Sequence, residues 1–80
     1  RKAVIEPKSL DLNAVILENV KLLRRLIRED IALQTVLDPQ LWRIKADPGQ
    51  LDQLIMNLVV NARDAMPSGG RLCIETQNVE

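Results

Sequence analysis

The chain has 80 residues, and its 11 basic and 11 acidic side chains give a formal net charge of zero. This length allows at most one domain, and the balanced charge with a single aromatic residue, Trp42, argues against a nucleic-acid partner. Histidine is absent, so the chain itself supplies no imidazole base and no histidine that accepts a phosphoryl group. One cysteine makes no internal disulfide, and no secretion signal or membrane-spanning apolar run of roughly twenty residues is present, so we expect a cytoplasmic location.

The first part of the chain predicts a short strand followed by a helix. Residues 2–8, which include Pro7, are typical of a brief edge strand. Asp11 or Ser9 is placed to cap a helix that runs over about residues 12–28. Its inward face is expected to consist of Leu12, Val15, Ile16, Asn19, Val20, Leu23, Leu26 and Ile27. Its other face, which we expect to be solvated, consists of Glu18, Lys21, Arg24, Arg25 and Arg28.

The middle of the chain predicts a β-hairpin. Residues 31–37 are rich in β-forming side chains, and residues 41–46 resume an extended pattern. The dipeptide Asp38-Pro39 between them marks a turn. We therefore expect the two extended segments to pair with each other.

A second helix and a final strand complete the pattern. Asp47 can accept the first free N–H groups of a helix that begins at Pro48 and runs to Met66, because proline suits the first helical position. The Pro-Ser-Gly-Gly sequence over residues 67–70 ends this helix, and residues 71–76 then alternate as a half-covered strand does. Within that strand we expect Cys73 to be a small buried hydrophobe.

These elements together predict an α+β fold. The order is strand, helix, hairpin, helix, strand, and both helices are amphipathic. We expect a two-layer sandwich in which both helices pack on one face of a mixed sheet of about four strands.

The second helix carries two faces of different chemistry. The apolar face, expected in the core, consists of Leu51, Leu54, Ile55, Leu58, Ala62, Ala65 and Met66. The polar face, flanked by Met56, Val59 and Val60, consists of Gln53, Asn57, Asn61 and Asp64. Asparagine is a poor helix former, so two asparagines one turn apart suggest the wall of a polar pocket, where an amide oxygen could bind Mg²⁺. Spacing alone leaves a second interpretation open, in which these side chains bond to neighbouring backbone or face water.

A family resemblance bears on this choice. The segments Asp47–Leu51, Asn57–Pro67 and Gly69–Gly70, followed by Leu72, Ile74 and Thr76, closely resemble the asparagine box of bacterial sensor histidine kinases. The similarity extends over essentially the whole chain. It implies that residues 1–80 are the N-terminal part of an ATP-binding catalytic domain with an incomplete Bergerat-type fold, which gyrase B and the mismatch-repair ATPases share.

The resemblance also implies roles for particular side chains. Asn61 would be the Mg²⁺ ligand, and Asn57, Asn61, Asp64 and Ala65 would line the phosphate side of an ATP site. A carboxylate repels phosphate, so Asp64 is expected to hold a water molecule, Arg63 or the hydration shell of the magnesium ion. The glycine boxes, the mobile lid and the phosphoacceptor histidine of the family have no counterpart in this sequence. No catalytic residue is therefore assigned here, and the segment alone is expected to be inactive.

For the longer parent protein, the resemblance implies phosphorylation of a histidine by ATP and transfer to a response regulator. The implied partners are ATP, the dimerisation and phosphoacceptor domain of the same kinase, and the receiver domain of a response regulator. The cytoplasmic location would hold for this segment whether or not the parent is anchored in a membrane. We also expect copies of the segment to self-associate, because the missing parts would leave apolar surface and a strand edge uncovered.

Two alternative functions stay open at this point. The first is a hydrolytic ATPase of the gyrase B or mismatch-repair type. Those enzymes carry a glutamate as general base where this chain has Asn57, and a neutral amide cannot take the proton. The second alternative is a non-catalytic interaction module, in which the asparagines only satisfy neighbouring backbone groups.

Overall fold

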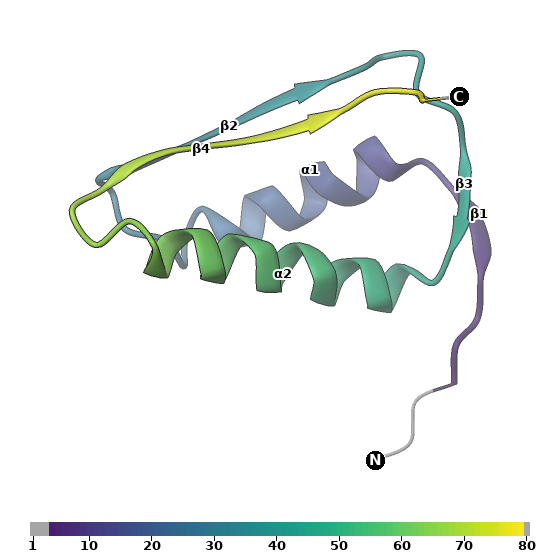
Figure 1. The fold of residues 1–80 in the computed structure, drawn as a ribbon. Helices are drawn as coiled ribbons and strands as arrows, with labels where there is room; N and C mark the ends of the chain where they lie inside the picture. Colours follow the sequence, from purple (N-terminus) through teal and green to yellow (C-terminus); the bar gives the residue numbers. More distant parts are fainter. Residues whose placement is uncertain (1–3, 80) are drawn as a thin grey trace.

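The structure, a computed structural model, describes residues 4–79. The helices are α1 (Leu12–Leu23) and α2 (Pro48–Asp64). The strands are β1 (Lys8–Leu10), β2 (Ile31–Leu37), β3 (Ile44–Ala46) and β4 (Gly70–Thr76). Both helices lie on the same side of the ribbon formed by β2 and β4, and the short pair β1 and β3 closes one end (Figure 1). The expected α+β class and the arrangement of both helices on one face are confirmed.

The strands form two separate two-stranded ladders, and the predicted hairpin is wrong. β2 pairs in parallel with β4, from Ile31 opposite Gly70 to Leu37 opposite Thr76, whereas β3 pairs antiparallel with β1. The loop after β2 is held by Asn78, which follows β4. Its amide oxygen accepts from the N–H of Trp42 at 2.8 Å, and its amide nitrogen donates to the carbonyl of Gln40 at 3.1 Å. These bonds hold the loop beside the end of β4. The chain then continues into β3, which pairs with β1.

The first strand lies later than the sequence indicated. Residues 4–7 belong to no strand, and β1 begins at Lys8, directly after Pro7. Proline has no N–H to donate to a ladder, which explains why pairing starts only beyond it. The rest of the predicted strand, residues 2–3, lies outside the described residues.

Helix α1 has the predicted cap but ends earlier than predicted. The Asp11 carboxylate accepts from the N–H groups of Asn13 and Ala14, so Asp11 rather than Ser9 is the N-cap. The helix stops at Leu23, and the following residues form tighter bonds between residues three apart, such as Leu26 N–H to Leu23 carbonyl at 2.9 Å. This tightening leaves Leu26 half exposed, so the prediction that it faces inward is wrong.

The basic side of α1 is exposed, as expected, and two of its cations also bond to other parts of the fold. The guanidinium of Arg24, the residue that caps the helix, donates to the carbonyl of Leu33 in β2 at 2.9 Å. Arg28 donates to the carbonyl of Met66 and to Asp30. Arg24 and Arg28 are thus exposed and also connect elements of the fold, whereas Lys21 and Arg25 are exposed without such a bond among the described residues.

The core lies between the two helices and the inner face of β2. Its buried side chains are Ile16, Val20, Leu23, Leu33, Ile55 and Val59. In α2 the buried stripe differs from the predicted one. Val59, predicted to flank the polar face, is 1% exposed, whereas Leu54 and Leu58, predicted in the core, are 53% and 60% exposed. Apolar side chains cover more of the circumference of α2 than one neighbour can bury. Helix α1 packs against Ile55 and Val59, so that part of the helix surface faces the core.

The expectation that Cys73 is buried is also wrong. β4 alternates as predicted, with Leu72 and Ile74 half-buried on the side of the helices. Cys73 lies on the opposite face, and its thiol is free and exposed. The reason is that none of the described elements covers that face of the β2–β4 ribbon (Figure 1).

Candidate functional site

The polar face of α2 is open to solvent. Asn57 and Asn61 are one turn apart and exposed, as are Gln53 before them and Asp64 after them. Within residues 4–79, the side-chain amides of Asn57 and Asn61 make no hydrogen bond to backbone or side chains. The structure therefore shows no bond from these amides to neighbouring backbone, and their exposure agrees with the other half of that interpretation, in which they face water. Both amides are free to bind a ligand.

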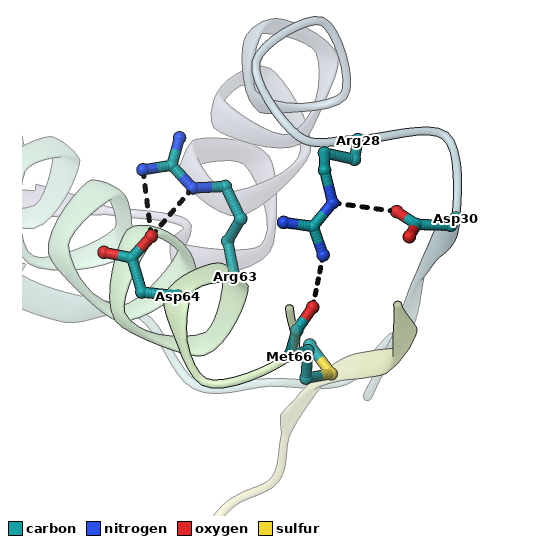
Figure 2. A network of polar contacts seen from close by, with 5 residues as sticks. All are labelled: Arg28, Asp30, Arg63, Asp64 and Met66. Atoms are coloured by element: carbon teal, nitrogen blue, oxygen red, sulfur yellow. Dashed lines mark hydrogen bonds and ion pairs between the residues drawn. The ribbon is translucent and has the colours of Figure 1, made fainter. Parts of the chain in front are cut away.

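The last turn of α2 holds the two other predicted site residues. The Arg63 guanidinium donates from Nε to Oδ1 of Asp64 at 3.2 Å, and Nη2 lies 3.2 Å from the same oxygen (Figure 2). This contact is one of the roles expected for Asp64, and it partly neutralises a carboxylate beside the asparagines. Ala65 is exposed and caps the helix, with its N–H donating to the carbonyl of Asn61 at 3.1 Å. The structure thus brings all four predicted residues to one side and one end of α2.

The end of α2 is joined to the turn before β2 by contacts that sequence reasoning missed. Arg28 donates to the carbonyl of Met66 and, at 3.0 Å, to the carboxylate of Asp30 (Figure 2). The backbone carbonyl of Asp30 in turn accepts from the N–H of Gly70 at 3.0 Å. Arg28 and Met66, and likewise Asp30 and Gly70, are about forty residues apart in sequence, so no local pattern signals these two contacts. They hold the segment that carries Asp64 and Ala65 against the neighbouring turn.

The start of α2 is anchored in a similar way. The Asp47 carboxylate accepts from the N–H of Gly49 at 2.8 Å and of Gln50 at 3.3 Å, which confirms the predicted cap. It also accepts from the N–H of Glu6 at 2.7 Å, which ties the segment before β1 to the helix. The Glu6 N–H, followed by the two helical N–H groups, holds the pKa of Asp47 below its ordinary value.

A third link joins the middle of α2 to α1. The side-chain amide of Asn19 donates to Oδ1 of Asp52 and to the carbonyl of Val15, both at 2.8 Å. Asn19, which the sequence placed on the inward face of α1, is half-buried. The exposed asparagines therefore lie on a helix that is held at its start, middle and end.

The side of α2 next to the polar face lines a different feature, an open apolar groove of about 470 Å³ between α2, β4 and the start of α1. Its walls include Leu54, Leu58, Leu72 and Ile74, and none of the predicted site residues takes part. The groove is too apolar to bind phosphate or a cation. The polar face and the groove are thus neighbouring surfaces of the same helix.

Residues 4–79 contain no group of three or more His, Cys, Asp or Glu side chains that could hold a metal ion. None of the helices in this range is long and apolar enough to cross a membrane.

Known proteins are similar to this chain in sequence and in fold. No protein-family model matches the chain. It is 44% identical over 79 residues to the sensor kinase CckA of Brucella abortus, a match that covers 99% of this chain and 8% of that protein. It is 35% identical over 75 residues to the sensor histidine kinase ZraS of Klebsiella oxytoca, covering 92% of this chain and 16% of that protein.

The fold is likewise similar to a solved structure. The crystal structure of the histidine kinase ThkA in complex with the response regulator TrrA superposes with a TM-score of 0.82 and 29% sequence identity. This match covers 99% of this chain and 24% of the kinase chain. The chain thus spans less than a quarter of each of these three proteins. It belongs to the sensor histidine kinase family, as a segment that corresponds to part of its longer relatives.

Proposed function

We propose that this segment is the N-terminal part of the ATP-binding domain of a histidine kinase, and that Asn61 supplies an amide oxygen to the Mg²⁺ ion that accompanies ATP. The proposal rests on the exposure of the Asn57 and Asn61 side chains and on their free amide groups. They are exposed, adjacent on one face of α2 and free of hydrogen bonds within the described residues. Membership of the sensor histidine kinase family supports it.

The chemistry of the available donors fits this role. Mg²⁺ prefers oxygen ligands and, in phosphoryl-transfer sites, takes only one or two of them from the protein, the rest coming from water and phosphate. The described residues offer no acidic cluster for a metal, so a single amide oxygen on an exposed helix face suits an ion that arrives with a nucleotide. In this proposal Mg²⁺ neutralises charge on the phosphates, and the chain orients them.

The neighbouring residues have narrower roles in the proposal. Asn57 and the exposed backbone at Ala65 line the phosphate side of the site. Asp64, which Arg63 contacts, would hold the hydration shell of the ion rather than a phosphate oxygen, because two anions would repel. Asn57 cannot act as a general base, which supports a phosphotransferase over a hydrolytic ATPase.

For the longer protein, we propose that the γ-phosphoryl group of ATP passes to a histidine on the dimerisation domain and then to the receiver domain of a response regulator. The complex of ThkA with its response regulator supports such a partner. A kinase domain that consumes ATP operates in the cytoplasm, and we propose that location for this segment. The segment alone holds only one wall of the nucleotide site, so we expect it to be inactive.

The proposal is tested by Asn61→Ala in the full-length kinase that contains this segment, assayed with γ-labelled ATP. Loss of the metal ligand is expected to reduce histidine phosphorylation by at least about a hundredfold, as removal of one electrostatic contact in a transition state does. The matched control is Gln53→Ala, which removes another exposed amide two turns earlier on the same helix. Circular dichroism of the variants reports whether the fold is intact. Labelling of a folded Asn61→Ala variant at the wild-type rate would refute the assignment.

A further inference from the structure

The end of α2 lacks the glycine cap that closes many helices. Such a cap is a glycine in the left-handed conformation directly after the helix, and it lets the next N–H groups reach back to the last free carbonyls. After α2 that position is Met66, and the next residue is Pro67, which has no N–H to donate. The first left-handed glycine comes only at Gly69. The carbonyl groups at this end of α2 therefore need a donor from elsewhere in the chain.

The guanidinium of Arg28 supplies such a donor. Its Nη2 donates to the carbonyl of Met66, and its Nε donates to the carboxylate of Asp30 at 3.0 Å (Figure 2). The same Met66 carbonyl accepts from the N–H of Gly69 at 3.0 Å. The backbone carbonyl of Asp30 accepts from the N–H of Gly70, also at 3.0 Å. Arg28 and Asp30 thus hold the turn after α2 at its first and last residues.

We propose that Arg28 is a positioning residue for the nucleotide, because it keeps the last turn of α2 in the conformation that binds ATP. This inference rests on the proposed function of α2. Asp64 and Ala65, which have roles on the phosphate side in that function, directly precede Met66. The N–H of Ala65 donates to the carbonyl of Asn61 at 3.1 Å, so the same turn also includes the proposed Mg²⁺ ligand. Arg28 itself contacts neither the metal ion nor the phosphates in this proposal.

The contribution of Arg28 is to affinity rather than to the chemical step. Without its bond the last turn of α2 would be partly frayed, and ATP would have to order this turn on binding. When only a fraction of the protein is competent to bind, the apparent affinity falls by that fraction. A hydrogen bond from a charged group shifts such an equilibrium by a factor of roughly ten or more. Once ATP is bound the turn is ordered, so the chemical step should proceed at nearly the wild-type rate.

The shape of the guanidinium matters as well as its charge. Two nitrogen atoms of Arg28, Nε and Nη2, bond to the Asp30 carboxylate and the Met66 carbonyl at the same time. Lysine carries its charge at a single point and lacks this planar fork. A cation beside the C-terminal end of a helix also interacts favourably with the helix dipole, and lysine would keep that part. Arg28→Lys therefore separates the contact with two partners from the effect of the charge.

The test is the KM for MgATP in histidine phosphorylation by the full-length kinase that contains this segment. We expect Arg28→Met, which has no donor, to raise KM about tenfold and to change kcat less than about threefold. Arg28→Lys should raise KM about threefold, since lysine can serve only one of the two partners. The matched control is Arg25→Met, which removes an exposed guanidinium without a bond among the described residues and should keep the wild-type KM. A variant that is merely less stable would lose active protein and lower kcat, with KM unchanged.

Hydrogen exchange measured by mass spectrometry reports on the turn itself. In Arg28→Met the amides of residues 61–70 should exchange about tenfold faster than in wild type without nucleotide. With Mg²⁺ and a saturating non-hydrolysable ATP analogue, they should exchange at the wild-type rate. A wild-type KM or wild-type exchange in a folded Arg28→Met variant would overturn the proposal. If that variant does not fold, a wild-type KM in Arg28→Lys would overturn it.

Asn61→Ala in the same assay separates this inference from the proposed function. Loss of labelling in Asn61→Ala together with a wild-type KM in Arg28→Met would reject only the role of Arg28. Labelling by Asn61→Ala at the wild-type rate would instead reject the magnesium site, and the role of Arg28 with it. Loss of labelling in Asn61→Ala together with a raised KM in Arg28→Met would support both.

Discussion

The Thr76 hydroxyl donates a hydrogen bond to Oδ1 of Asn13 at 2.9 Å, which joins the end of β4 to the first turn of α1 across 63 residues of sequence. The same hydroxyl accepts from the N–H of Asp38 at 3.1 Å, and the Asn13 amide nitrogen donates to the carbonyl of Asp38 at 2.6 Å. The three residues form a closed ring of partly buried hydrogen bonds at the end of the β2–β4 ribbon. This ring fastens the ribbon to the helical layer.

Removal of the Thr76 hydroxyl should destabilise the fold. Thr76→Val keeps the shape of the side chain but leaves the Asp38 N–H and the Asn13 oxygen without their partner, so we expect a loss of about 1–3 kcal/mol in the free energy of unfolding. Thr76→Ser keeps the hydroxyl and should lose less than half as much. Urea denaturation followed by circular dichroism measures both. Equal stability of Thr76→Val and wild type would show that the ring contributes nothing.

The orientation of α2 can be tested by two truncations at adjacent residues. Val59→Ala removes buried methyl groups from a side chain that is 1% exposed, and we expect a loss of about 2 kcal/mol. Leu58→Ala truncates a side chain that is 60% exposed and should change stability by less than about 0.5 kcal/mol. Urea denaturation gives both values. The reverse order would support the orientation that the sequence pattern predicted.

The turn after α2 should require glycine at position 69. Gly69 has a φ of 89°, and a Cβ there would lie 2.6 Å from the Asp30 carbonyl oxygen. We expect Gly69→Ala to cost about 1–3 kcal/mol through backbone strain and this clash. The control is Gly49→Ala in the first turn of α2, where a Cβ would approach only the Asp47 side chain at 3.2 Å. Because alanine is the better helix former, Gly49→Ala should lose no more than about 0.5 kcal/mol.

The Asp47 cap should make the fold sensitive to acid. The three N–H groups that its carboxylate accepts lower its pKa below the ordinary value of 3.8 in the folded state. The stabilisation is therefore fully present above that ordinary value and is lost as the pH falls through the folded pKa. Asp47→Asn keeps an N-capping oxygen but cannot titrate. We expect thermal unfolding of this variant to depend less on pH than that of wild type between about pH 5 and pH 2. Parallel pH profiles for the two proteins would contradict the effect.

Local patterns in the sequence were enough to predict much of this molecule. Asp11 and Asp47 are the caps that were expected, Pro48 opens α2, and the alternation of β4 is the predicted one. The candidate site was also predictable, because Asn57 and Asn61 lie on one face of a regular helix whatever that helix packs against. Each of these features depends on residues no more than a few positions apart.

Long-range packing determined the strand pairing and the buried side of each helix, which the local sequence patterns did not predict. β2 pairs with β4 and β3 with β1, in each case with a strand more than thirty residues away, so no local pattern indicated the partners and the predicted hairpin was wrong. Which part of the apolar arc of α2 is buried depends on the position of α1, so Val59 is in the core and Leu58 is not. The sequence by itself determined where the helices begin, their N-caps and the exposed pair of asparagines, because these follow from local backbone and side-chain chemistry. The tertiary structure alone decided strand pairing, the covered face of each element and the contacts of Arg28, since these depend on where distant segments meet.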